Sequence, residues 1–196
     1  MPDVTANMMI TLDGYATGDG QSRERPFGDM NLDLLSAWMF KYPEENAEEL
    51  AAITEAGAFI MGRNMFGPDR GEWDLDWRGW WGEDPPYHAP TFVLSHRPRP
   101  SVEMEGGTVF HFVSDGIETV LERAREVAGE KTVSIAGGPS TLNQYLAAGL
   151  VDELRLHVVP FVAGRGERIF AGADDLELKP VSSRTTPHVT HLVYRR

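Results

Sequence analysis

Short apolar runs alternate with amphipathic stretches along this chain, and the alternation predicts most of its elements. Runs rich in β-branched and aromatic residues predict strands at residues 4–12, 58–62, 91–95, 108–113 and 131–138. Residues 31–42, 45–56 and 116–128 are typical of helices. The last of these has one apolar face, made by Ile117, Val120, Leu121, Ala124 and Val127.

The second half of the chain continues the pattern and then changes. Leu142, Tyr145 and Leu146 predict a helix that Gly149 ends, and residues 151–160 predict a strand. The segments "RIF", "LELKPVSSRTT" and "HVTHLVYRR" follow with strand character and no helices between them, so we expect them to close the sheet with an antiparallel hairpin. The fold class predicted is α/β, a mixed, mostly parallel sheet with helices on both faces, in one domain over residues 1–196.

Residues 71–90 fit no element. This segment holds four tryptophans and Tyr87 among acids, glycines and prolines. A long loop in a compact domain is usually functional or disordered, and so many aromatic residues argue against disorder.

Composition narrows the possible partners. The net charge of -12 argues against a nucleic-acid partner, because phosphate backbones are held by clustered Lys and Arg. The absence of cysteine excludes a disulfide framework and fits a reducing, cytoplasmic location. No apolar run has membrane-spanning length, and the first residues lack the basic start of a signal peptide, so we expect no membrane association.

The turn "AGGPST" is the first candidate for chemistry. Gly137 and Gly138 follow a strand, and Pro139, Ser140 and Thr141 begin a helix. A helix start offers unpaired N–H groups and partial positive charge, and glycines let a phosphate approach them. The motif alone equally fits a tight turn with an ordinary Ser or Thr cap.

Two further strand ends carry polar residues. One strand ends in Gly62, Arg63 and Asn64, and the next ends in Ser95, His96 and Arg97. Ligands of parallel α/β sheets lie at the carboxyl ends of strands, so the three ends together predict a site for a dinucleotide's phosphates. Each basic residue taken singly could instead be a solvated loop charge. The chain lacks the Rossmann and P-loop glycine motifs.

The same stretches carry a family resemblance. "MMITLDGYAT", "FIMGRNMFG", "FVLSHRP", the segment from "SIAGGPST" to "GERIF" and the final "VTHLVYRR" resemble the dihydrofolate reductase-like superfamily. They are most similar to the branch that holds the reductase domain of riboflavin biosynthesis and its stand-alone bacterial relatives. The matches run from end to end in the family's order, and "GG" with "GLVDEL" is the most specific of them.

The resemblance implies a bound NADPH and a homodimer. By position, Gly137, Gly138, Ser140 and Thr141 would hold the pyrophosphate. Arg63 and Asn64 would lie near the pyrophosphate and the adenosine phosphate, and Ser95 with His96 or Arg97 near the 2′-phosphate. Met9 and residues 13–16 would border the nicotinamide.

The chain also departs from the family's pattern. Dihydrofolate reductases have a pterin-binding carboxylate early in the first helix, where this chain has Leu35 or Ser36, with Asp33 about one turn earlier. Folate reduction is therefore not expected. The bifunctional riboflavin enzyme also carries a zinc deaminase with cysteine ligands, and a chain without cysteine has at most the reductase half.

Candidates for the substrate side are weaker. Asp13 is the nearest acid for proton transfer, although an Asp-Gly pair is also a common turn. Met9, Tyr15, Trp77, Trp80 and Trp81 are candidates for a substrate pocket, and the tryptophans could equally pack at a subunit contact. We expect no metal site, because His188 and His191 should face opposite sides of a strand and His111 and His157 should sit singly.

These features predict an NADPH-dependent reductase of a small planar or heterocyclic substrate, pteridine- or pyrimidine-like, similar to 5-amino-6-(5-phosphoribosylamino)uracil reductase. The alternative is a non-catalytic nucleotide- or drug-binding module on the same fold. A flavin-assisted reductase is a third reading.

Overall fold

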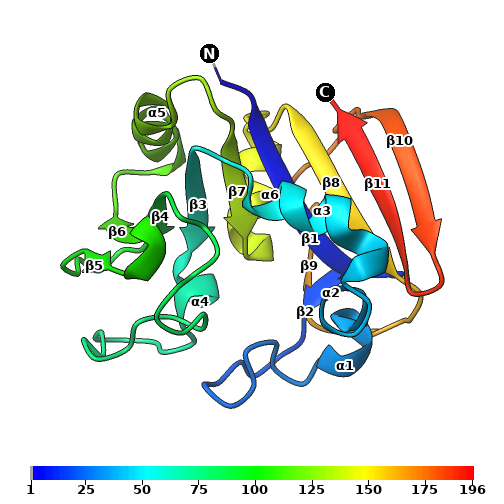
Figure 1. The fold of residues 1–196 in the computed structure, drawn as a ribbon, viewed down its shortest axis with the longest axis horizontal. Helices are drawn as coiled ribbons and strands as arrows, with labels where there is room; N and C mark the ends of the chain where they lie inside the picture. The colour runs from blue at the N-terminus through cyan, green and yellow to red at the C-terminus, as the bar shows by residue number, and fades with distance from the viewer. Residues whose placement is uncertain (1) are drawn as a thin grey trace.

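A nine-stranded mixed sheet organises the chain (Figure 1) in the computed structural model, which describes residues 2–196. Its strands are β1 (Val4–Thr11), β3 (Ala58–Gly62), β4 (Pro90–Leu94), β5 (Val102–Glu103), β6 (Val109–Val113), β7 (Val133–Gly137), β8 (Glu153–Val159), β10 (Lys179–Thr186) and β11 (Val189–Arg195). Their order is β10-β11-β8-β1-β7-β3-β4-β6-β5. The strands from β8 to β6 in that order run parallel, and the strands outside them pair antiparallel.

The C-terminal strands correct one expectation. β10 and β11 form the predicted antiparallel hairpin at one edge of the sheet. The "RIF" segment does not join them: β9 (Glu167–Arg168) pairs instead with β2 (Tyr15–Thr17) in a separate two-stranded sheet. Gly166 makes this pairing possible, because its positive φ of 120° and its missing side chain allow close approach to the backbone of Thr17 and Gly18.

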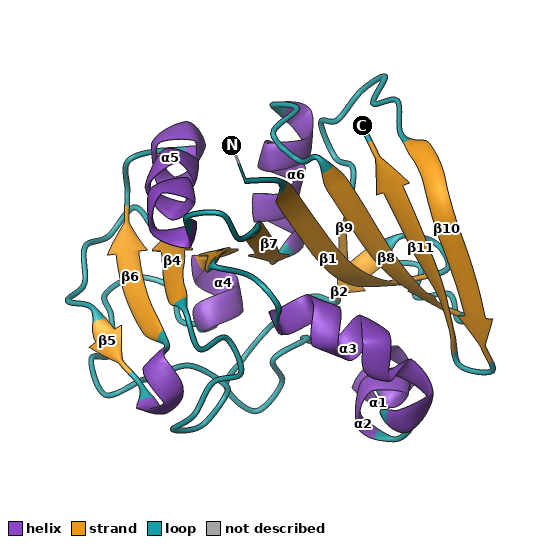
Figure 2. Ribbon diagram, turned by 45° about the horizontal axis from the view of Figure 1, so that its top comes forward, coloured by secondary structure: helices purple, strands orange, loops and turns teal. Residues whose placement is uncertain are grey.

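Helices cover both faces of the sheet, as predicted. They are α1 (Leu32–Leu35), α2 (Ala37–Phe40), α3 (Ala47–Thr54), α4 (Arg63–Phe66), α5 (Ile117–Ala128) and α6 (Pro139–Ala147), with 3₁₀ turns at Glu44–Asn46 and Glu105–Gly107. Figure 2 shows α5 and α6 on one face and α1 to α4 on the other. The helix expected over residues 31–42 is split at Ser36, whose hydroxyl donates to the carbonyl of Leu32 at 2.7 Å.

The core differs between the two faces. Under α5 and α6, alternate strand residues such as Ala6 and Ile135 pack in one cluster with Leu121 and Tyr145. The opposite face holds two separate clusters. One surrounds Phe66, below α4, and the other surrounds Trp38, below α2. The division leaves space between the clusters on this face.

The tryptophan-rich segment packs on the first of these two clusters. Among the described residues, those from 67 to 89 form neither helix nor strand, as expected. Trp73, Trp77 and Trp81 pack against the cluster around Phe66, and Trp81 stacks on Phe110 at a centroid distance of 5.6 Å. The loop is therefore an ordered wall of this face.

Across residues 2–196, every helix is too short or too polar to span a lipid bilayer.

Candidate active site

The three polar strand ends meet at one edge of the sheet. β7, β3 and β4 are consecutive neighbours and parallel, so their carboxyl ends lie side by side. A cavity of about 1000 Å³ opens there, between the two clusters of the α1–α4 face. Of the residues that the sequence singled out, it is lined by Met9, Gly62, Arg63, Asn64, Trp80, Trp81, Ser95, His96, Arg97, Gly138, Pro139, Ser140 and Thr141. Its volume is at the upper end for small-molecule sites.

The glycine pair lies at this end of β7, and of the two only Gly138 is among the described lining residues. Gly137 has a φ of +121°, and a Cβ there would lie only 3.2 Å from Met8 Cε and 3.3 Å from Met65 Sδ. Gly138 differs: its φ is −71°, it is the N-cap residue of α6, and a Cβ on it would meet no protein atom within 4 Å. Because no atom lies near that position, Gly138 leaves open space beside the start of α6. The peptide bond between the two glycines is cis.

The start of α6 is suited to an anion. No side chain caps it, and Pro139 occupies its first turn with no N–H to satisfy. Thr141 N–H already donates to the carbonyl of Gly138 at 3.1 Å, so the Ser140 N–H and the helix dipole are what favour negative charge at this point. Gly62 brings β3 against the same turn, because a Cβ there would overlap the hydroxyl of Thr141. The residues present thus fit a phosphate group of a dinucleotide.

Basic side chains border the neighbouring strand ends. Arg63 donates to the carbonyl of Gly71 at 2.8 Å and lies 3.9 Å from the ring centroid of Trp73. Burial, and then the nearby Arg97 charge, lower the pKa of Arg63. Arg97 itself pairs with Glu72.

Two other polar residues at these ends bond locally. Ser95 Oγ accepts from the N–H of Arg97 at 3.1 Å, which shapes the turn after β4. Asn64 Oδ1 accepts from Arg70. These contacts fix the turns after β3 and β4 beside the glycine turn.

Four predicted residues are absent from the described lining: Gly137, Asp13, Tyr15 and Trp77. Asp13 accepts hydrogen bonds from Thr11 Oγ1 and from the N–H groups of Ala163 and Gly164, and these lower its pKa to about 2. The carboxylate therefore joins the Asp-Gly turn to a segment distant in the sequence, and Asp13 does not line the cavity in the described chain.

Tyr15 and Trp77 are also absent from the described lining. The Tyr15 ring lies under the Arg168 guanidinium, 4.8 Å away. Trp77 Nε1 donates to the carbonyl of Phe66 at 2.9 Å, so this tryptophan braces the loop rather than facing the cavity.

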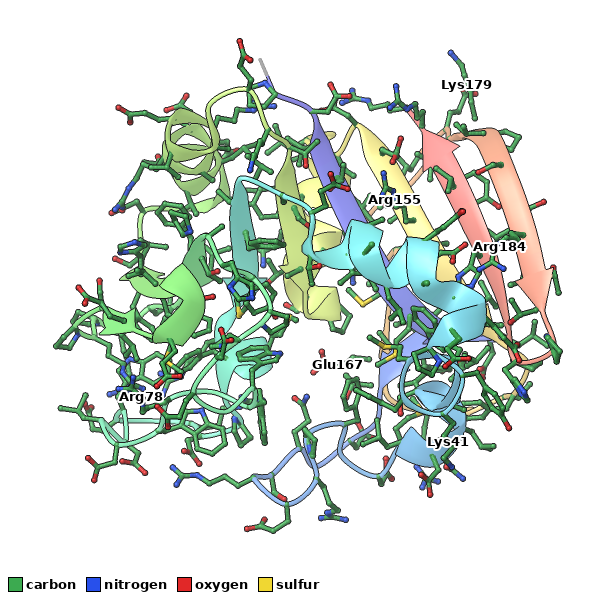
Figure 3. The ribbon with its side chains drawn as sticks, in the orientation of Figure 1. Lys41, Arg78, Arg155, Glu167, Lys179 and Arg184 are labelled. Atoms are coloured by element: carbon green, nitrogen blue, oxygen red, sulfur yellow. The ribbon has the colours of Figure 1, made fainter. Side chains whose placement is uncertain are left out.

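Among the lining residues that sequence reasoning missed, Asn7, Trp38, His157 and Glu167 carry polar groups. Glu167 is the only carboxylate among the described lining residues, and Figure 3 shows it in the open region between the two clusters. Asn7, Trp38 and His157 also line the cavity. A polar residue inside an apolar strand was the available signal for Asn7 and His157.

The expectation that His157 sits singly is wrong. Its Nδ1 lies 2.8 Å from Nδ1 of His191, directly opposite on β11. His188 lies in the turn before β11 and stacks on Tyr42, with ring centroids 3.7 Å apart. His111 pairs with Ser101 at 3.1 Å.

Solved structures share the fold of this mostly parallel sheet, which is dihydrofolate reductase-like. A dihydrofolate reductase from Enterococcus faecalis, complexed with NADP(H), is 15% identical and covers 99% of this chain and 96% of its own, with a TM-score of 0.61. A pyrimidine reductase-like protein from Corynebacterium diphtheriae is 18% identical and covers 99% and 91%, with a TM-score of 0.57.

Within this fold, residues 2–192 match the model of the RibD C-terminal domain family, and the chain belongs to that family. Among curated proteins, the uncharacterized protein YyaP of Bacillus subtilis is 24% identical over 205 residues. That match covers 97% of this chain and 93% of the relative. The resemblance seen in the sequence is confirmed at the level of the family and the fold.

Proposed function

We propose that the chain is an NADPH-dependent reductase that transfers a hydride to a small planar substrate of the pyrimidine or pteridine class. The observation that carries the proposal is the open, uncapped start of α6 at Gly138, in one cavity with basic groups and a carboxylate. Membership of the RibD C-terminal domain family supports a reductase. The solved NADP(H) complex on the same fold supports the cofactor.

Each end of the cavity has a role in this proposal. Gly138, Ser140 and Thr141 hold the pyrophosphate through the start of α6 and its hydroxyls. Arg63 and Arg97 hold the adenosine phosphates. NADPH, when bound, supplies the hydride.

Trp80, Trp81 and Glu167 act on the substrate side of the cavity in this proposal. Trp80 and Trp81 close one side of the cavity and exclude water from the reacting atoms. We assign proton delivery to Glu167, a role supported by its being the only acid among the described lining residues. In this proposal Glu167, rather than Asp13, is the proton donor.

We also propose that the protein is cytoplasmic and forms a homodimer. Strand β10 supports the dimer, because it is an edge strand whose residues are exposed along almost its whole length. An edge of this kind pairs readily with another chain.

Calorimetric titration of the full chain with NADPH tests the proposal. Saturable binding, followed by NADPH oxidation with a member of a pyrimidine and pteridine panel, would support it. Absence of NADPH binding would contradict it. Binding without oxidation across the panel would favour the non-catalytic binding module.

A further inference from the structure

One wall of the cavity concentrates buried polar atoms that have no partner. Among the described residues, eight buried side-chain nitrogen or oxygen atoms lack a hydrogen bond, and four of them belong to Asn7, Trp38 and His157. These residues are 8%, 0% and 2% exposed, and all three line the cavity. Buried polar groups are almost always paired, so this concentration points to a ligand that completes the pairing.

The three side chains belong to neighbouring elements. Asn7 and Met9 on β1 lie opposite Arg155 and His157 on β8, so Asn7 is a diagonal neighbour of His157. Trp38 of α2 packs on His157, with ring centroids 4.6 Å apart and planes tilted by 34°. Met9 lines the same wall, and its flexible side chain can adapt to a flat ring.

A hydrogen-bond chain behind His157 fixes which of its nitrogens carries hydrogen. Asn46 Nδ2 donates to the carbonyls of Trp38 at 3.0 Å and Tyr42 at 2.8 Å, so its Oδ1 faces His191 Nε2, 2.8 Å away. An amide oxygen only accepts, and therefore His191 Nε2 carries the hydrogen. The Glu49 carboxylate, 3.9 Å from the same nitrogen, favours the same tautomer.

The position of the hydrogen on His191 determines which nitrogen of His157 carries hydrogen. Neutral His191 presents a bare Nδ1, so Nδ1 of His157 must donate across their 2.8 Å contact. That leaves Nε2 of His157 as a bare acceptor, which is buried and has no partner among the described residues. Burial lowers the pKa of His157 to about 3, so the ring stays neutral at physiological pH.

We propose that Asn7, Trp38 and His157 recognise a neutral lactam edge of the substrate ring, an inference that rests on the proposed function. His157 Nε2 accepts from a ring N–H, Trp38 Nε1 donates to the adjacent ring carbonyl, and the Asn7 amide pairs with the next polar substituent. His191 and Asn46 are positioning residues, because they act only by setting the tautomer of His157. A ring methylated at its nitrogens would leave His157 unpaired, and a site built for a donor rejects an analogue without it.

A matched pair of pyrimidines tests this recognition. 6-Aminouracil has ring N–H groups, and 6-amino-1,3-dimethyluracil has none. Calorimetry, with and without NADPH, should show the wild-type chain binding 6-aminouracil at least about tenfold more tightly. His157→Phe, which keeps a ring against Trp38, should abolish the preference and leave NADPH affinity unchanged.

Three outcomes would overturn the inference: equal binding of the two probes, no binding of 6-aminouracil, or a preference that persists in folded His157→Phe. Failure of NADPH to bind the wild type would instead remove the proposed function and leave the probe comparison intact.

Histidine NMR tests the tautomer in the wild-type protein without any ligand. In ¹⁵N-histidine-labelled protein, His157 should carry its proton on Nδ1 and should not titrate between pH about 5 and 8. The charged groups that face the pair are Glu49 from α3, Arg155 on β8 and Arg184 on β10, which bonds Glu49. The pKa of Glu49 is lowered by its bond to Arg184 and that of Arg184 is raised by the same bond, so both keep their charge over this range. A His157 protonated on Nε2 would contradict the inference.

Discussion

Replacing Gly138 with Asp should separate cofactor binding from folding more cleanly than any other change in the cavity. The φ of −71° is ordinary for any residue, and the added Cβ would meet no protein atom within 4 Å. Asp is also a better N-cap than Gly, by a few tenths of a kcal/mol, so the variant should fold at least as stably. The new carboxylate can bond the N–H groups at the start of α6 and occupy the place of the pyrophosphate.

The size of the effect follows from charge repulsion. Two unit charges about 4 Å apart repel by about 1 kcal/mol in bulk water and about 4 kcal/mol near a protein surface. Solvent reaches the cavity and screens the two charges, so we take a repulsion near the lower of these two energies. NADPH affinity should fall at least about tenfold, which corresponds to about 1.4 kcal/mol.

Calorimetry with NADPH measures this loss, and thermal unfolding of the same sample shows that the variant is folded. Gly138→Asn is the matched control, because it keeps the size and the capping group without the charge, and its loss should be smaller. Unchanged NADPH affinity in a folded Gly138→Asp protein would refute the phosphate site at this turn.

Five further predictions concern the rest of the site, the stability of the chain and its assembly. NADPH should bind more tightly than NADH, and raising the salt should narrow this difference in affinity by screening. Arg97→Ala should reduce the difference in affinity between the two nucleotides. Glu72→Gln, which frees Arg97 from its ion pair, should increase that difference. Glu167→Gln should lose turnover in an NADPH-oxidation assay while keeping NADPH affinity. Asp13→Asn should keep turnover and lower stability: the pKa of Asp13 is lowered to about 2, so its contribution should be complete above pH about 4 and be lost as the pH falls toward 2, as acid unfolding would measure. Dihydrofolate should not be turned over in an absorbance assay, because no helix carboxylate lines the cavity in the described chain. Light scattering should report a homodimer, and Trp80→Ala should remove most of the fluorescence change on NADPH binding; a monomer, or an unchanged signal in the variant, would count against this.

The strands and their ends could be predicted because local pattern determines them. Apolar runs of five to eight residues marked the parallel strands, and the polar groups that follow them marked the cofactor side of the cavity. Neighbouring strand ends at one edge then followed from the fold class alone.

The substrate side could not be predicted, because it depends on register between distant segments. His157 and His191 are 34 residues apart and meet only because β11 pairs with β8 in that register. Glu167 reads as a surface charge until β9 pairs with β2 rather than with the main sheet. The helix break at Ser36 likewise depends on a side-chain bond to Leu32 that the apolar pattern does not encode.

A crystal structure of the full chain grown with saturating NADPH tests the central claim most directly. We predict the pyrophosphate at Gly138 and Ser140, the 2′-phosphate near Arg97, and the nicotinamide ring in the same cavity as Met9 and Glu167. A nucleotide bound outside this cavity, or no bound nucleotide, would contradict the account.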